Sequence, residues 1–115
     1  MEEVKFPFDV DEFFEKCVKN NHIPKNDFEK QAVLLKLLDE FEDNKIYTEE
    51  EVNIKIKKHF GDYSTLRREL VNFGYMQRDP YKGEYKVVKR TLTKEDIRKN
   101  TLLLKHAEPF KVLEE

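Results

Sequence analysis

Residues 62–73 read DYSTLRRELVNF, and residues 74–88 continue with GYMQRDPYKGEYKVV. These two segments carry the clearest indication of the fold. At the helical period of about 100° per residue, the apolar side chains of the first segment share one stripe: Tyr63, Leu66, Leu70 and Phe73. Polar and basic side chains share the opposite stripe: Ser64, Thr65, Arg68 and Asn72. Asp62 stands at the N-cap position, where its carboxylate can accept a hydrogen bond from the first turn. The pattern predicts an amphipathic helix over 62–73.

The segment after this helix predicts a β-hairpin over 75–89. GYMQR and EYKVV are rich in aromatic and β-branched residues, and DPYKG between them has Pro and Gly at turn positions. Before the helix, YTEEEVNIKIKKHF begins with a capping box, Thr48 and Glu51, and continues with an apolar stripe. Ile46 and Tyr47 form a short extended segment that can lie beside the hairpin. Two helices joined by a short connection and followed by a hairpin predict a winged helix-turn-helix.

The rest of the chain predicts three further helical segments. FPFDVDEFFEKCVKN indicates an N-terminal helix within 1–22, FEKQAVLLKLLDEFED a central core helix, and RTLTKEDIRKNTLLLKHAEPF a single C-terminal helix within 91–115. We therefore expect one domain of 115 residues, α+β and mostly α, with the winged core at 23–90. The C-terminal helix has two alternatives, packing on the N-terminal helix or forming a dimer contact.

Composition indicates a folded protein of a reducing compartment. Charged residues make up 40% of the chain, but nine Phe and five Tyr are too many aromatics for a disordered chain. The single Cys17 has no partner for an internal disulfide, and no apolar run is long enough to span a bilayer. We expect a cytoplasmic protein that does not enter a membrane.

Charge is distributed unevenly along the chain. Residues 1–54 carry 7 Lys and Arg against 15 Asp and Glu, whereas residues 55–90 carry 10 against 4. The basic part is the predicted helix pair and hairpin. A local basic face suits one nucleic-acid-binding surface, although surface charge also serves solubility alone.

No motif for catalysis, a metal or a cofactor is present. The three His and one Cys lack metal-ligand spacing, and no nucleotide-binding or nucleophile motif occurs. His59 and Asp62 lie close in sequence, but they are accounted for as helix-end residues. We expect a protein that is not an enzyme and has no cofactor.

The candidate DNA-contacting residues lie on the polar stripe and the hairpin. Arg68 points away from the apolar stripe and suits guanine O6 and N7. The other candidates are Ser64, Thr65 and Asn72 on the helix and Arg78, Lys82 and Lys86 on the hairpin. Lysines on an exposed edge strand also prevent aggregation, so both interpretations stay open for the hairpin residues. Arg67 lies at the shoulder of the stripe and is expected to be structural or phosphate-binding, paired with a carboxylate such as Glu51 or Asp62.

The blocks YTEEEVN, DYSTLRREL and GYMQRDPYKGEY, in that order, resemble a bacterial family of unknown function whose members occur alone or fused behind an arsenic-repressor-type helix-turn-helix module. The resemblance covers residues 24–88 and implies a winged-helix-like domain associated with transcription regulators. The matching residues are Tyr47, Thr48, Glu51, Val52, Asn53, Asp62, Leu66, Arg67, Arg68, Glu69, Leu70 and Arg78. We expect this chain to lack the separate N-terminal module of the fused members, so that the domain either binds DNA itself or is the partner-binding half of a regulator.

Together these features predict a DNA-binding transcriptional regulator with recognition helix 62–73 and wing 75–89, acting on double-stranded DNA. The alternative is a winged-helix module that binds another protein, or a second copy of this chain, without binding DNA.

Overall fold

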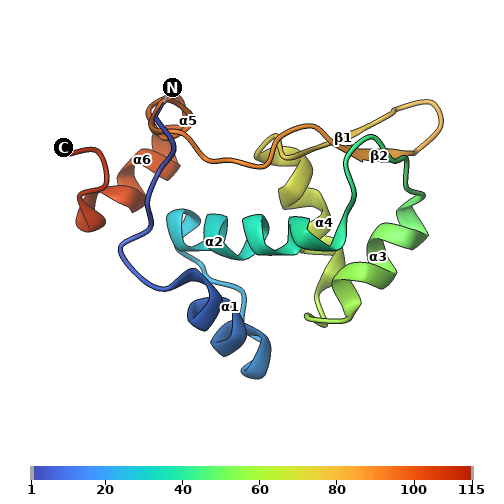
Figure 1. Cartoon of the computed structure of the whole chain (residues 1–115), viewed down its shortest axis with the longest axis horizontal. Helices are drawn as coiled ribbons and strands as arrows, with labels where there is room; N and C mark the ends of the chain where they lie inside the picture. The colour runs from blue at the N-terminus through green and yellow to red at the C-terminus, as the bar shows by residue number, and fades with distance from the viewer. Residues whose placement is uncertain (1, 115) are drawn as a thin grey trace. The chain divides into compact units, whose positions relative to one another are not determined.

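The computed structural model describes residues 2–114, which form an α+β fold that is mostly helical (Figure 1). The chain divides into two compact units. The first combines residues 2–36 with residues 91–114, and the second is Leu37–Arg90. The second unit begins later than residue 23, where the winged core was expected to begin. The reason lies in Phe28, whose ring contacts rings from both terminal segments.

The first unit contains the helices of the two terminal segments. They are α1 at Val10–Lys19, α2 at Asp27–Leu37, α5 at Lys94–Arg98, α6 at Thr101–Ala107 and a 3-10 turn at Glu108–Phe110. Asp9 caps α1 by accepting a hydrogen bond from the backbone of Glu12 at 3.1 Å. Asn26 caps α2, with its Oδ1 2.9 Å from the backbone nitrogen of Phe28. These helix starts follow from local sequence.

Aromatic rings and backbone pairing hold the first unit together. The Phe28 ring centroid lies 5.1 Å from that of Phe6 and 5.0 Å from that of Phe110. The backbone nitrogen of Val4 donates to the carbonyl of Leu92 at 2.7 Å. Segments from opposite ends of the sequence therefore build one core.

The C-terminal segment is two short helices, and the prediction of a single helix there is wrong. Asn100 adopts an extended conformation, with φ −117° and ψ 109°, and its side chain accepts a hydrogen bond from the backbone of Leu103. Thr93 and Asp96 form a capping box at the start of α5. Because Asn competes with the helical backbone for hydrogen bonds, Asn100 ends α5 and caps α6. The His106 Nδ1 of α6 accepts a hydrogen bond from the backbone of Asp27 at 2.8 Å.

The second unit contains two helices and a hairpin. Its elements are a 3-10 turn at Leu38–Glu40, α3 at Glu49–Lys57, α4 at Tyr63–Asn72, β1 at Met76–Arg78 and β2 at Tyr85–Val87. The predicted capping box of Thr48 and Glu51 begins α3. Asp62 caps α4, and Gly74 follows its end with φ +83°, a conformation that favours glycine at this position. The helix over 62–73 is therefore confirmed.

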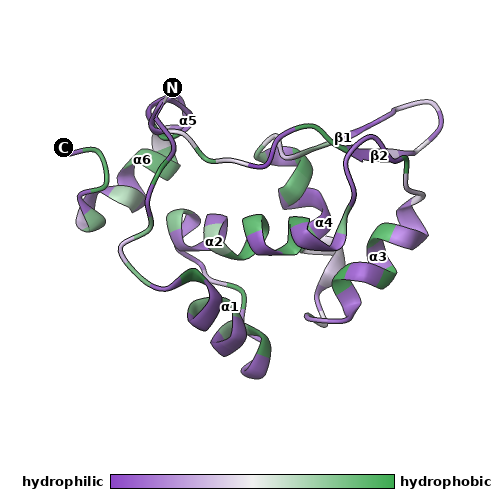
Figure 2. Ribbon diagram, in the orientation of Figure 1, coloured by the Kyte–Doolittle hydropathy of each residue, from purple (hydrophilic) through white to green (hydrophobic). Residues whose placement is uncertain are grey.

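Buried side chains of the second unit follow the predicted stripes. Val52, Ile56 and Phe60 from α3 and its C-terminal end are at most 1% exposed, and Leu66 and Leu70 of α4 are fully buried. Tyr63 and Phe73, at the two ends of α4, are only partly buried. Figure 2 shows hydrophobic and hydrophilic residues on different parts of α4. The polar stripe of α4 is thus left outside the core.

A third extended segment joins the hairpin. Tyr47 and Tyr85 form an isolated antiparallel bridge, with both N–H···O distances at 2.8 Å. This confirms the prediction that residues 46–47 lie beside the hairpin. At the end of the hairpin, Arg90 donates to the carbonyls of Leu38 and Phe41 and contacts Asp43 at 2.7 Å. The first and last residues of the second unit are therefore tied together.

Candidate nucleic-acid interface

At the start of α4, the carboxylate of Asp62 accepts hydrogen bonds from two of the candidate residues. Asp62 accepts hydrogen bonds from the Thr65 hydroxyl at 2.8 Å and from the Thr65 backbone at 3.3 Å. The Ser64 hydroxyl donates to the same carboxylate at 3.5 Å. These hydrogen bonds, with that of the Thr65 hydroxyl foremost, hold the pKa of Asp62 below its usual value. The Ser64 and Thr65 hydroxyls are therefore already hydrogen-bonded to an ionised carboxylate when a ligand approaches.

The exposed side of α4 presents Arg68 and Asn72. Both side chains are exposed, as the polar stripe predicted. The Asn72 amide donates to Glu69 at 3.1 Å, so one of its two donors is in use. Arg68 makes no ion pair within residues 2–114, although its charge helps to lower the pKa of Asp62. Arg68 is thus the cation of α4 that stays available to a ligand.

Arg67, one residue earlier, is held in the structure. It donates from Nη1 to the amide oxygen of Asn53, and its Nε lies 3.7 Å from Glu49 Oε1. Only 12% of its side chain is exposed. The expected pairing with Glu51 or Asp62 is wrong. Both of those carboxylates cap helices instead, Glu51 through the Thr48 backbone at 2.8 Å.

Glu49 joins three elements at the N-terminus of α3. Besides contacting Arg67 of α4, its Oε1 accepts a hydrogen bond from the Tyr85 hydroxyl of β2 at 2.9 Å. Burial, and secondly this hydrogen bond, raises the pKa of Tyr85 above its ordinary value. Sequence reasoning assigned Glu49 and Tyr85 no role. The two residues are 36 positions apart in the sequence, so no local sequence pattern indicates that they are in contact.

Strand register places the hairpin cations on opposite faces. Gln77 pairs with Lys86, and Arg78 pairs with Tyr85. Directly opposed residues in an antiparallel pair point to the same side, and successive residues alternate. Lys86 therefore shares a face with Gln77, whereas Arg78 lies on the other face. The two side chains leave opposite faces of the hairpin, although both line one cavity beside it.

The hairpin tip is a well-ordered turn. Asp79 Oδ1 accepts hydrogen bonds from the backbones of Tyr81 at 2.8 Å and Lys82 at 3.1 Å. The hydrogen bond from the Lys82 backbone, and secondly the one from the Tyr81 backbone, lowers the pKa of Asp79. Gly83 has φ +66°, and a Cβ at this position would lie 3.4 Å from the Arg78 guanidinium. The Arg78 guanidinium thus lies close to Gly83 at the tip, and Lys82 beside Gly83 in sequence is exposed.

The second unit separates its cations into two groups. One group is engaged with carboxylates: Lys58 with Glu40, Arg67 with Glu49 and Arg90 with Asp43. The other group makes no ion pair in the described part of the chain: Arg68, Arg78, Lys82 and Lys86. These four lie on α4 and the hairpin; Lys55 of α3 also makes no ion pair there, but its ammonium lies over the Phe41 and Tyr47 rings. Lys57 lies over the Tyr63 ring, 4.4 Å from its centroid, so it too has a local partner.

Two other kinds of site are absent from the described residues. No three or more His, Cys, Asp or Glu side chains of residues 2–114 are grouped so as to hold a metal ion. Over the same residues, no helix is long and apolar enough to cross a bilayer.

Comparison with known proteins gives a family but no activity. Residues 21–87, more than half of the chain, match the family described as uncharacterized protein conserved in bacteria, DUF2087, and the chain belongs to this family. No curated protein matches the chain. No solved structure matches it either.

Proposed function

We propose that this chain is a DNA-binding transcriptional regulator built on a winged helix-turn-helix. Helix α4 enters the major groove of double-stranded DNA, with Arg68 and Asn72 toward the base edges. The hairpin β1–β2 is the wing and contacts the flanking phosphates. In this proposal the protein acts in the bacterial cytoplasm.

The order of elements in the second unit supports this proposal. The helices α3 and α4 contact each other and are followed directly by a hairpin that also contacts α4. Tyr47 adds the short third strand that winged helices place beside the hairpin. Glu49 links α3, α4 and β2, so the helix and the hairpin are held in a fixed relation.

The observation that carries the proposal is the distribution of cations that make no ion pair. Arg68 on α4 and Lys82 and Lys86 on the hairpin form none in residues 2–114. Arginine and lysine side chains that protein carboxylates do not neutralise are free to displace counterions from DNA phosphates. Arg78 adds a fourth such charge near the tip.

The test is a titration of fluorescent duplex fragments at two salt concentrations. Phosphate contacts make the affinity fall steeply as salt rises. The double variant Lys82→Ala with Lys86→Ala should weaken binding about equally for all sequences and flatten the salt dependence. Folded wild-type protein that shows no salt-sensitive binding to any fragment contradicts the proposal.

A second candidate function is a winged-helix module that binds another protein. It is supported by the carboxylates within the same surface: Asp62 contacts Ser64 and Thr65, and Glu69 contacts Asn72. A carboxylate close to a phosphate is unfavourable, whereas mixed charges suit a protein partner. The salt titration separates the two functions, because a protein-binding module gives no duplex binding.

A further inference from the structure

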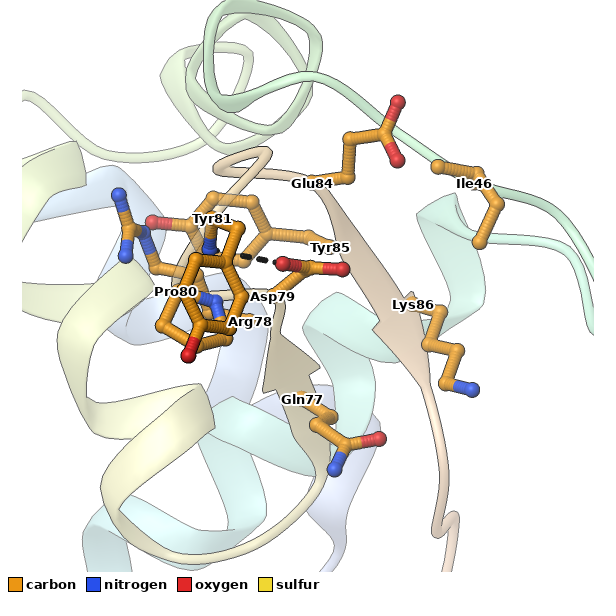
Figure 3. A pocket seen from close by; sticks show the side chains of 9 residues that line it. All are labelled: Ile46, Gln77, Arg78, Asp79, Pro80, Tyr81, Glu84, Tyr85 and Lys86. Carbon is orange, nitrogen blue, oxygen red and sulfur yellow. Dashed lines mark hydrogen bonds between the residues drawn. The ribbon is translucent and has the colours of Figure 1, made fainter.

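A cavity on the hairpin is distinct from the exposed stripe of α4. It has a volume of about 350 Å³, which is within the range of small-molecule sites. Figure 3 shows the side chains that line it, among them Ile46, Gln77, Asp79, Tyr81, Glu84 and Lys86. All of them belong to the second unit. The cavity therefore lies within one compact body.

An exposed aromatic ring lies at this cavity on a fixed turn. Tyr81 is 96% exposed, yet its backbone donates to Asp79 Oδ1 at 2.8 Å, so the turn that carries it is held in place. Ile46, 52% exposed, adds a second apolar side chain. A planar ligand stacked on Tyr81 would cover apolar surface, and little loop ordering would oppose it.

Three polar side chains at the cavity are available to a ligand. Gln77, Glu84 and Lys86 make no side-chain hydrogen bond or ion pair in the part of the chain that the structure describes. Gln77 and Lys86 are cross-strand partners, so they point to the same face of the hairpin. A glutamine amide offers a donor and an acceptor side by side, which matches the N6 and N7 edge of adenine.

We propose that the hairpin cavity binds a nucleobase, adenine in preference to pyrimidines. The base stacks on Tyr81, its edge bonds to the Gln77 amide, and Lys86 meets the attached phosphate. The base can come from an unpaired nucleotide of a nucleic acid or from a free nucleotide. The proposal does not require α4 to enter a DNA groove.

The test is a titration followed by ¹H–¹⁵N NMR on the full chain. The ligands are adenosine monophosphate, a short oligodeoxyadenylate and an oligodeoxythymidylate of equal length. We expect shifts at the Gln77 side-chain amide and at the backbone of residues 79–86, with adenine bound more tightly than thymine. Shifts with adenosine monophosphate identify a free-nucleotide site, and shifts with the oligodeoxyadenylate alone identify an unpaired strand.

Variants decide whether the cavity is responsible. Tyr81→Ala should weaken binding about tenfold, whereas Tyr81→Phe, which keeps the stacking ring, should bind nearly as wild type. Gln77→Ala should reduce the preference for adenine. The matched control is Val88→Ala, an exposed apolar residue beside the hairpin that does not line the cavity.

Three outcomes overturn the proposal: no shift with either adenine ligand at millimolar concentration, no preference for adenine over thymine, or equal losses in Tyr81→Ala and Val88→Ala. Duplex binding is measured separately with Arg68→Ala, so failure here leaves the proposed function standing, and the reverse also holds.

Discussion

The two sides of α4 show how differently neighbouring residues of one type are used. Arg67 is mostly buried, donates to Asn53 and contacts Glu49, while Arg68 is exposed and makes no ion pair among residues 2–114. Both count equally in the positive charge of residues 55–90. The summed charge of a sequence segment therefore overstates the charge that a ligand meets, because some of the charged side chains hold the fold together.

Leu70→Ala tests the buried side of α4 and should have the largest effect. Leu70 is fully buried, so its truncation removes apolar contacts and leaves a cavity. We expect a loss of about 2 to 5 kcal/mol in the free energy of unfolding, measured by urea denaturation. A loss below about 1 kcal/mol would show that the site collapses or that α4 is not packed as described.

Arg67→Ala tests the residue at the boundary between the buried and the exposed sides of α4. Removing the guanidinium leaves the Asn53 amide oxygen without its donor and Glu49 without its cation. We expect a loss of about 1 to 3 kcal/mol in unfolding free energy. Arg67→Lys is the control, since it keeps the charge but not the fork of donors and should recover only part of the loss. Full recovery by lysine would mean that charge alone matters here.

Thr48→Ala tests the turn that positions Glu49. Thr48 accepts the backbone hydrogen bond of Glu51 at 3.1 Å, and its loss should cost about 0.5 to 2 kcal/mol. Thr48→Ser keeps the hydroxyl and should stay close to wild type in thermal denaturation. An unchanged alanine variant would place the start of α3 elsewhere.

Arg68→Ala tests the exposed side of α4. It should have the smallest effect on the free energy of unfolding, within about 0.5 kcal/mol. If α4 is the recognition helix, the same variant should lose about 1 to 3 kcal/mol of discrimination between duplex sequences. Fluorescence anisotropy with matched and altered duplexes measures the loss, after each variant has been checked by thermal denaturation. Unchanged selectivity in a protein that binds duplex DNA would remove Arg68 as a base reader.

Features set by neighbouring residues were predictable from the sequence. The caps at Asp9, Thr48 and Asp62 depend on contacts only three residues long, and all three are present. The bridge of Tyr47 with Tyr85 followed from a short extended segment next to a predicted hairpin. Asn100 also carried a local signal, but the helical spacing of apolar residues on both sides obscured it.

Features set by distant residues were not predictable in this way. The partner of Arg67 was misassigned because Glu51 and Asp62 each cap a helix, whereas the Glu49 carboxylate approaches Arg67 in the folded unit. The hairpin cavity depends on strand register, which places Gln77 beside Lys86. Likewise, His59 was expected only as a helix-end residue, yet its ring contacts Glu40, 19 residues earlier in the chain.

The hydrogen bonds of Arg90 have a consequence for the order of folding. Residues 37–90 are inserted between the two halves of the first unit, whose core needs both halves. Bringing distant segments together costs entropy that grows with the length of the loop between them. Because Arg90 holds the end of the insertion to the Leu38 and Phe41 carbonyls, folding the second unit first shortens that loop to a few residues. By holding the two ends of the second unit together, Arg90 lowers the entropic cost of bringing the two halves of the first unit together.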